Sequence, residues 1–214
     1  MKNLKDHIPY AVFAILLVLF LGTGSLIGCM FYGSTTQTET EKPTETKVVE
    51  TTISATKASD AVKEQIKFFE GFSPRAIWDN GAYTYGYGHR DEAIKEGDTI
   101  TKEEANMLFE QDIVRFEAAV VRFATKHQLT LKQNEFDALV SFLFNLGENY
   151  LQVIEERSLT DSRYVLVNYL TSQCYTEEEM VAEWTSYCHS NGTVLQGLVA
   201  RRTYEVNLFL YGSY

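Results

Sequence analysis

A segment with very few polar side chains constrains this chain more than any other. Residues 136–147 read Phe-Asp-Ala-Leu-Val-Ser-Phe-Leu-Phe-Asn-Leu-Gly, so apolar side chains would surround a helix on nearly all sides. Such a helix has to be enclosed by other elements. Thr130 and Gln133 form a capping box before it, and Gly147 ends it. The segment predicts the buried centre of a helical lobe. Its single polar stripe consists of Asn134, Asp137, Ser141 and Asn145.

Other segments with helical periodicity flank this centre. Thr101 and Glu104 form a capping box at the start of a helix whose apolar positions recur from Ala105 to Phe123. This spacing is typical of one buried helical face. Three later segments show the same periodicity, near residues 164–170, 177–188 and 199–210. Together they predict a mainly helical lobe.

A hairpin signal precedes these helices. Asp79-Asn80-Gly81 lies between two segments with strand character, residues 75–78 and 82–87, and Asn-Gly favours the tight turn of a hairpin. Before the hairpin, Ser59 begins a short helix that ends at Gly71. The order of elements predicts an α+β fold, in which a small β-hairpin lobe and a larger helical lobe leave a cleft between them.

Two carboxylic acids precede this turn. Glu70 lies at the end of the first helix and Asp79 at the turn, so both can face one cleft. Glycoside hydrolysis needs two opposed carboxyl groups. One stays protonated and donates to the leaving oxygen, whereas the other stays ionised and activates water or acts as the nucleophile. The pair therefore predicts a glycosidase.

Several motifs, in this order, resemble one known family. They are Phe69-Glu70-Gly71, Asp79, the run Thr84-Tyr85-Gly86-Tyr87-Gly88-His89, residues 136–147, and Gly197-Leu198-Val199-Ala200-Arg201-Arg202. Over about residues 58–212 the chain is similar to the phage-type lysozymes, the T4-like and lambdoid endolysin muramidases. The resemblance implies a lysozyme-like fold. It also implies hydrolysis of the β-1,4 bond between N-acetylmuramic acid and N-acetylglucosamine in peptidoglycan, with inversion.

The resemblance also implies roles for individual residues. Glu70 is expected to be the general acid, and Asp79 is expected to stay ionised on the opposite face and to share the attacking water with Thr84. Arg201 is expected beside the catalytic glutamate, with Arg202 as the alternative. An inverting pair has its carboxyl groups about 6.5–9.5 Å apart. The candidate residues are Glu70, Asp79 and Thr84 as catalytic residues and Tyr85, Asn145 and Arg201 as substrate contacts.

Two other functions are compatible with parts of this pattern. A lytic transglycosylase acts with one acid and no water, and a wall-binding module needs no acid. The joint presence of Glu70, Asp79 and Thr84 argues against both. The products separate the three classes, because hydrolysis leaves reducing muramic ends, transglycosylation leaves anhydro ends, and binding leaves neither.

The distribution of charge restricts the partners. Residues 1–57 carry five acidic and five basic side chains, whereas residues 58–214 carry 24 and 14, so the whole net charge of −10 lies on the second part. This charge disfavours binding of nucleic acid. No His/Cys cluster has the spacing of a metal site, and no cofactor is expected. Peptidoglycan is the expected partner, bound by a monomer.

The N-terminal region predicts contact with a membrane. Residues 8–32 contain no Asp, Glu, Lys, Arg or His, and about 20 apolar residues suffice to cross a bilayer. Lys2 and Lys5 precede this run and no basic residue follows until Lys42, which predicts a cytoplasmic N-terminus. A cleaved signal peptide and a lipoprotein signal ending at Cys29 are the alternatives. The catalytic part is expected outside the cytoplasm, in the cell envelope or secreted.

The sequence therefore predicts four regions. Residues 1–7 form a cytoplasmic tail and residues 8–32 a transmembrane anchor or signal. Residues 33–57 are rich in Thr and Glu and poor in large apolar side chains, a composition typical of a disordered linker. Residues 58–214 form the lysozyme-like catalytic domain.

Overall fold

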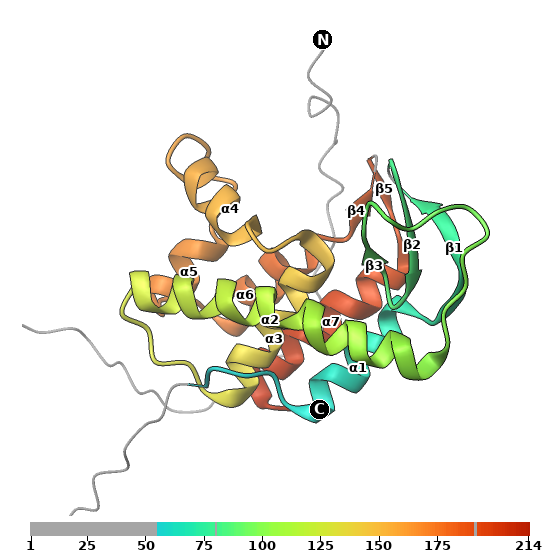
Figure 1. Ribbon diagram of the computed structural model, residues 1–214. Helices are drawn as coiled ribbons and strands as arrows, with labels where there is room; N and C mark the ends of the chain where they lie inside the picture. The colour runs from blue at the N-terminus through green and yellow to red at the C-terminus, as the bar shows by residue number, and fades with distance from the viewer. Residues whose placement is uncertain (1–54, 80, 191) are drawn as a thin grey trace, which may run out of the picture. The chain divides into compact units, whose positions relative to one another are not determined.

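The computed structural model describes residues 55–79, 81–190 and 192–214, which belong to one compact unit (Figure 1). The predicted tail and membrane segment, and the predicted linker up to residue 54, lie outside these residues. None of the described helices is long and apolar enough to cross a bilayer.

The sheet is small and antiparallel, with strand order β1-β2-β3. Its strands are β1 (Ser73–Asp79), β2 (Ala82–Gly86) and β3 (His89–Arg90). Asp79 pairs with Ala82, and Gly81 has φ +91, a backbone conformation that suits glycine. The predicted hairpin is confirmed. The third strand, and a separate pair formed by β4 (His189–Ser190) and β5 (Thr193–Val194), were not predicted.

The described residues also contain seven helices. Figure 1 shows the sheet near the N-terminal end of α2 and the helices α4 and α5 towards its C-terminal end. The sequence did not predict α4. The helices are α1 (Asp60–Glu70), α2 (Lys102–Lys126), α3 (Gln133–Leu146), α4 (Tyr150–Ser158), α5 (Leu166–Ser172), α6 (Glu177–Thr185) and α7 (Gln196–Tyr211).

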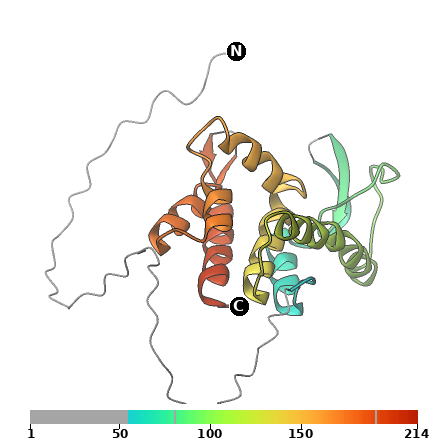
Figure 2. The same ribbon diagram turned by 90° about the vertical axis from the view of Figure 1, so that its left-hand side faces the viewer.

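Helix α3 is the centre of the helical lobe, as its composition predicts. Every residue from 136 to 143 is 0% exposed, and α3 packs against α1, α2, α4 and α7. Figure 2 shows α7 running alongside α3. The apolar side chains of α3 belong, with those of α2, to the hydrophobic core, and their burial stabilises this lobe.

The predicted start of α3 is wrong. The helix begins at Gln133, and Lys132 is its N-cap, so Thr130 and Gln133 do not form a capping box. The backbone N–H of Lys132 donates to Oε2 of Glu135 at 2.9 Å, which satisfies one of the unpaired donors at a helix start. Leu131 is 5% exposed, and its burial holds the preceding residues outside the helix.

The polar stripe of α3 lies at the contacts with α1 and α7. Nδ2 of Asn134 donates to the carbonyl oxygens of Leu208 and Phe209, both at 2.9 Å. Oγ of Ser141 donates to Glu205 at 2.7 Å. A polar stripe on an apolar helix therefore marks where buried hydrogen bonds join neighbouring helices.

Asp137 joins three parts of the chain. Its carboxylate accepts from the backbone N–H of Ser59 at 3.0 Å, from Oγ of Ser59 at 2.6 Å and from Gln133 at 2.9 Å. The hydroxyl of Tyr214 also donates to it at 2.6 Å, and burial together with Asp137 raises the pKa of Tyr214 to about 12. The carboxylate is 0% exposed, so these donors replace its hydration. Asp137 thus fixes both the start of α1 and the C-terminal residue.

Replacing this buried acceptor should destabilise the protein. Asp137→Asn keeps the shape but turns an amide N–H₂ group towards donors, and we expect it to lower the free energy of unfolding by about 2–4 kcal/mol. Urea denaturation measures the change. Asp91→Asn is the control: Asp91 is exposed, and its replacement should change stability by less than about 0.5 kcal/mol. Equal stability of the two variants would contradict the role given to Asp137.

Candidate active site

Glu70 is the last residue of α1, at the point where the chain turns towards the sheet. Gly71 follows with φ +70 and ends the helix, and its N–H donates to the carbonyl oxygen of Lys67. The Glu70 side chain is 22% exposed, and Nη1 of Arg201 donates to its Oε1 at 2.6 Å. These two residues are 131 positions apart in the sequence. The predicted contact between Arg201 and Glu70 is confirmed.

Arg201 itself is held on several sides. It is 3% exposed, its Nε donates to Glu205 at 3.1 Å, and its Nη2 donates to the carbonyl oxygen of Ser141 at 2.9 Å. Its guanidinium also lies over the ring of Phe69, 5.4 Å from the centroid. The planar group therefore has one orientation, and this orientation directs Nη1 at Glu70.

Arg202, the alternative partner, points elsewhere. Its Nη1 donates to Oε2 of Glu205 at 2.5 Å, and its Nη2 donates to Oδ1 of Asn145. Both arginines donate to Glu205, but neighbouring residues of a helix lie about 100° apart, so only Arg201 reaches Glu70 and only Arg202 reaches Asn145.

A groove of about 510 Å³ lies beside Glu70. Glu70, Asn145 and Arg201 contribute its polar groups. Apolar side chains from two elements add to its lining, namely Phe68, Leu195 and Leu198. The groove therefore combines a carboxyl group with apolar walls, as ligand sites generally do.

Phe68 was not recognised as part of this groove. Its sequence position suggests a place on the packed face of α1, yet it is 77% exposed. The buried face of α1 follows Val62 and Ile66, and Phe68 lies off that face. Helical spacing counted from Val62 and Ile66 is the signal that would have shown Phe68 to be exposed.

Asp79 and Thr84 lie on the sheet. Asp79 ends β1 with its side chain 55% exposed, and Nη2 of Arg90 donates to its carbonyl oxygen at 2.7 Å and lies 3.6 Å from its Oδ2. Thr84 is 7% exposed and pairs with Ile77 across β1 and β2, where Asp79 pairs with Ala82. Because side chains alternate along strands, this register puts the side chains of Asp79 and Thr84 on the same face.

Tyr85 lies on the other face of β2. Its ring stacks on His89 with centroids 6.0 Å apart, and it packs against the hydrophobic core. Nδ1 of His89 is 2.8 Å from a carboxylate oxygen of Asp112 on α2. Tyr85 does not line the groove beside Glu70, so its contact with substrate stays a prediction.

Two glycines bring the sheet close to its neighbours. Gly86 has φ +64, and a Cβ atom there would be 3.0 Å from Cβ of Ala105 on α2. Gly88 has φ +87, and a Cβ atom there would be 3.9 Å from Oε2 of Glu70. Glycine at 86 lets the strand approach α2, and Gly88 places the turn between β2 and β3 opposite the second oxygen of Glu70.

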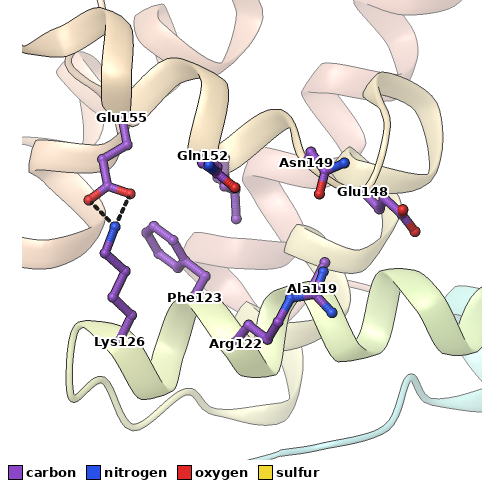
Figure 3. Close-up of a pocket in the computed structure, with 9 residues that line it drawn as sticks. Ala119, Arg122, Phe123, Lys126, Glu148, Asn149, Gln152 and Glu155 are labelled. Carbon is purple, nitrogen blue, oxygen red and sulfur yellow. Dashed lines mark hydrogen bonds and ion pairs between the residues drawn. The ribbon is translucent and has the colours of Figure 1, made fainter.

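A second, smaller cavity lies between α2 and α4 (Figure 3). Its volume is about 180 Å³. Nζ of Lys126 donates to both carboxylate oxygens of Glu155 at 2.8 Å across this cavity. No residue predicted for the active site lines it. In the described part of the chain, no group of three or more His, Cys, Asp or Glu side chains could hold a metal ion.

The fold and this site together define a class. A mainly helical lobe beside a small antiparallel sheet, with a glutamate in the groove at the end of the first helix, is the lysozyme-like architecture. Residues 67–205 match the family model described as phage lysozyme, and the chain belongs to that family.

Individual relatives agree with this assignment. The endolysin of Bacillus phage B103 is 33% identical over 151 residues, which cover 69% of this chain and 52% of the relative. The endolysin of Acyrthosiphon pisum secondary endosymbiont phage 1 is 32% identical over 147 residues, 67% of this chain and 91% of the relative. The chain thus spans about half the length of the Bacillus phage B103 endolysin that it matches.

Solved structures show the same fold. The muramidase domain of SpmX from Asticaccaulis excentricus has a TM-score of 0.57 and 33% identity, and the match covers 72% of this chain and 97% of that domain. The endolysin of Escherichia coli O157:H7 phage FAHEc1 has a TM-score of 0.58 and 28% identity, covering 74% of this chain and 96% of that one.

The ion pair of Arg201 should also contribute to stability. Arg201→Met removes the guanidinium from Glu70 and leaves the buried Glu205 with one arginine, so we expect a loss of about 3–5 kcal/mol in the free energy of unfolding. Arg115→Met is the matched control, because Arg115 is exposed on α2. Chemical denaturation measures both variants, and a fully stable Arg201→Met protein would show that the pair adds nothing.

Proposed function

We propose that this chain is a peptidoglycan hydrolase, a muramidase that cleaves the β-1,4 bond between N-acetylmuramic acid and N-acetylglucosamine. The observation that carries the proposal is Glu70, which lines a groove while Arg201 holds one of its oxygens. Membership of the phage lysozyme family supports it, as does the fold shared with a muramidase domain. Tyr85, Asn145 and Arg201 belong to the proposed substrate-binding set.

Glu70 is the proposed general acid. A guanidinium can only donate, so Oε1, which accepts from Arg201, is the less favourable place for the acidic proton. The proton that is transferred therefore sits on Oε2, the oxygen opposite Gly88. It passes to the glycosidic oxygen as the bond to the anomeric carbon breaks.

Asp79 and Thr84 are the proposed water-activating residues. A water molecule attacks the anomeric carbon from the opposite face, and its proton goes to the Asp79 carboxylate. The Thr84 hydroxyl orients the same water. Attack from that face inverts the anomeric centre, and the two carboxyl groups are then expected about 6.5–9.5 Å apart. Their shared face on the sheet, given by the strand register, supports this pairing of roles.

The first test removes the proton donor. Glu70→Gln keeps the shape and an acceptor oxygen for Arg201 but has no acidic proton, so we expect turnover to fall by a factor on the order of 10²–10⁴. Release of reducing ends from purified peptidoglycan measures it. Glu64→Gln, exposed and earlier on the same helix, should keep parental activity. Turnover of Glu70→Gln within threefold of the parent would remove Glu70 from this role.

The second test separates the two possible reactions. Asp79→Asn should lower hydrolysis nearly as much as Glu70→Gln, because the negative charge near the water and the developing oxocarbenium ion is lost. A lytic transglycosylase that uses Glu70 alone would hardly change. Mass analysis of the muropeptides distinguishes reducing from anhydro ends, and Asp91→Asn is the control. Full activity with anhydro products would favour the transglycosylase.

We propose further that the catalytic domain, residues 58–214, is tethered outside the cytoplasmic membrane. The run over residues 8–32 is long enough to cross a bilayer, and Lys2 and Lys5 favour a cytoplasmic N-terminus. Residues 33–57 then act as the linker. Confinement near the wall raises the local concentration of substrate, which an acidic domain cannot achieve by attraction to an acidic polymer.

Cell fractionation and mapping of the mature N-terminus test the tether. We expect the full-length chain in the membrane fraction, and residues 58–214 alone in the soluble fraction. A chain that starts at a lipidated Cys29 would replace the transmembrane anchor with a lipid anchor. A soluble chain that starts after Tyr32 would exclude both forms of attachment.

A further inference from the structure

Glu205 is a buried carboxylate between the two arginines of α7. It is 0% exposed. Its Oε1 accepts from Nε of Arg201 at 3.1 Å and from Oγ of Ser141 at 2.7 Å. Its Oε2 accepts from Nη1 of Arg202 at 2.5 Å and from Nε1 of Trp184 at 3.2 Å. Each oxygen thus holds one arginine and one neutral donor, which fixes the carboxylate as well as both guanidinium groups.

Arg202 in turn faces Asn145. Arg202 is 0% exposed, and its Nη2 donates to Oδ1 of Asn145. Its guanidinium lies over the ring of Phe142, 4.8 Å from the centroid. A guanidinium carries only donors, whereas an amide carries an acceptor oxygen and a donor N–H₂ group. Only the amide oxygen of Asn145 can face Arg202, so the N–H₂ group faces away from it.

Asn145 lines the same groove as Glu70 and Arg201. The charges from the groove inwards alternate in sign, from Glu70 to Arg201, Glu205 and Arg202. Burial lowers the pKa of Arg202, and the nearby Arg201 also lowers it, whereas Glu205 raises it. Glu205 thus favours the charged form of Arg202, the form that excludes the Asn145 N–H₂ group.

We propose that Arg202 is a positioning residue that acts through Asn145, turning its N–H₂ group into the groove, where it donates to a carbonyl oxygen of the substrate. Glu205 holds Arg202 in place for this role. The inference rests on the proposed function and names the chemical group that the groove recognises. Two substrate groups supply such an oxygen, the acetamido group of the sugars and the peptide bonds of the stem peptide.

Steady-state kinetics on soluble glycan chains test the inference. We expect Arg202→Met and Asn145→Ala each to raise KM about tenfold, the size of one lost hydrogen bond of about 1.4 kcal/mol, with kcat within about threefold of the parent. If Arg202 acts only through Asn145, the double variant should have a KM no higher than Asn145→Ala alone, as a double-mutant cycle requires for coupled residues. Additive effects would overturn the inference.

The Asn145→Asp variant distinguishes the loss of the N–H donor at position 145 from a loss of packing around Arg202. The carboxylate keeps, and strengthens, the contact with Arg202, so the melting temperature should not fall. It has no N–H to offer the groove, so KM should rise as in Asn145→Ala. Parental KM in this variant would overturn the proposed donation. Arg202→Lys retains a charged donor and should recover part of the loss seen in Arg202→Met, while Arg115→Met should leave KM and kcat unchanged.

Two further comparisons complete the experiment. Equal losses on peptide-free and peptide-bearing chains assign the acceptor to the acetamido group, and a loss confined to peptide-bearing chains assigns it to the stem peptide. If the parent releases neither reducing nor anhydro ends, the proposed function fails. In that case, calorimetry would measure the affinity of the same glycan chains for the parent and for the variants at positions 145 and 202. Equal affinities of the parent and the variants would overturn the inference.

Discussion

The Arg201 guanidinium joins the three helices on which the site depends. It reaches Glu70 at the end of α1, the carbonyl oxygen of Ser141 on α3, and Glu205 on α7 itself. The groove is lined from all three of these helices and from Leu195, just before α7, so its shape follows from their packing. A planar group with donors at fixed angles suits this position, because each contact restrains the other two.

Charges in the interior of a protein persist only when they are paired and hydrogen-bonded. Glu205 meets this condition with the two arginines of α7, with Ser141 and with Trp184. Asp137 is stabilised instead by hydrogen bonds from the neutral donors Ser59, Gln133 and Tyr214. The apolar part of α3 lies in the hydrophobic core, whereas its polar stripe sets the register in which α1 and α7 pack on it. The same stripe ends at Asn145 in the groove, so the interactions that align the helices extend to the site.

The fold was largely predictable where the signals are local. The Asn-Gly turn, the capping box at Thr101 and the glycine after Glu70 each depend on a few neighbouring residues, and the elements that they predict are present. The capping box at Thr130 was wrong because burial of Leu131 delays the helix. The strands β3, β4 and β5 have two residues each, too few for periodicity to identify them. The nine-residue helix α4 was missed although its buried Leu151 and Ile154 have helical spacing.

The sequence by itself determined most of the elements, the candidate catalytic residues Glu70, Asp79 and Thr84, and the family resemblance that singled out Arg201. Only the tertiary structure decided between Arg201 and Arg202 as the partner of Glu70, and only it showed the role of Glu205. Residues 70 and 201 are 131 positions apart, and no local pattern encodes such a contact. It arises because α1 and α7 both pack on α3, and that packing depends on side-chain shape and on the buried hydrogen bonds rather than on sequence spacing.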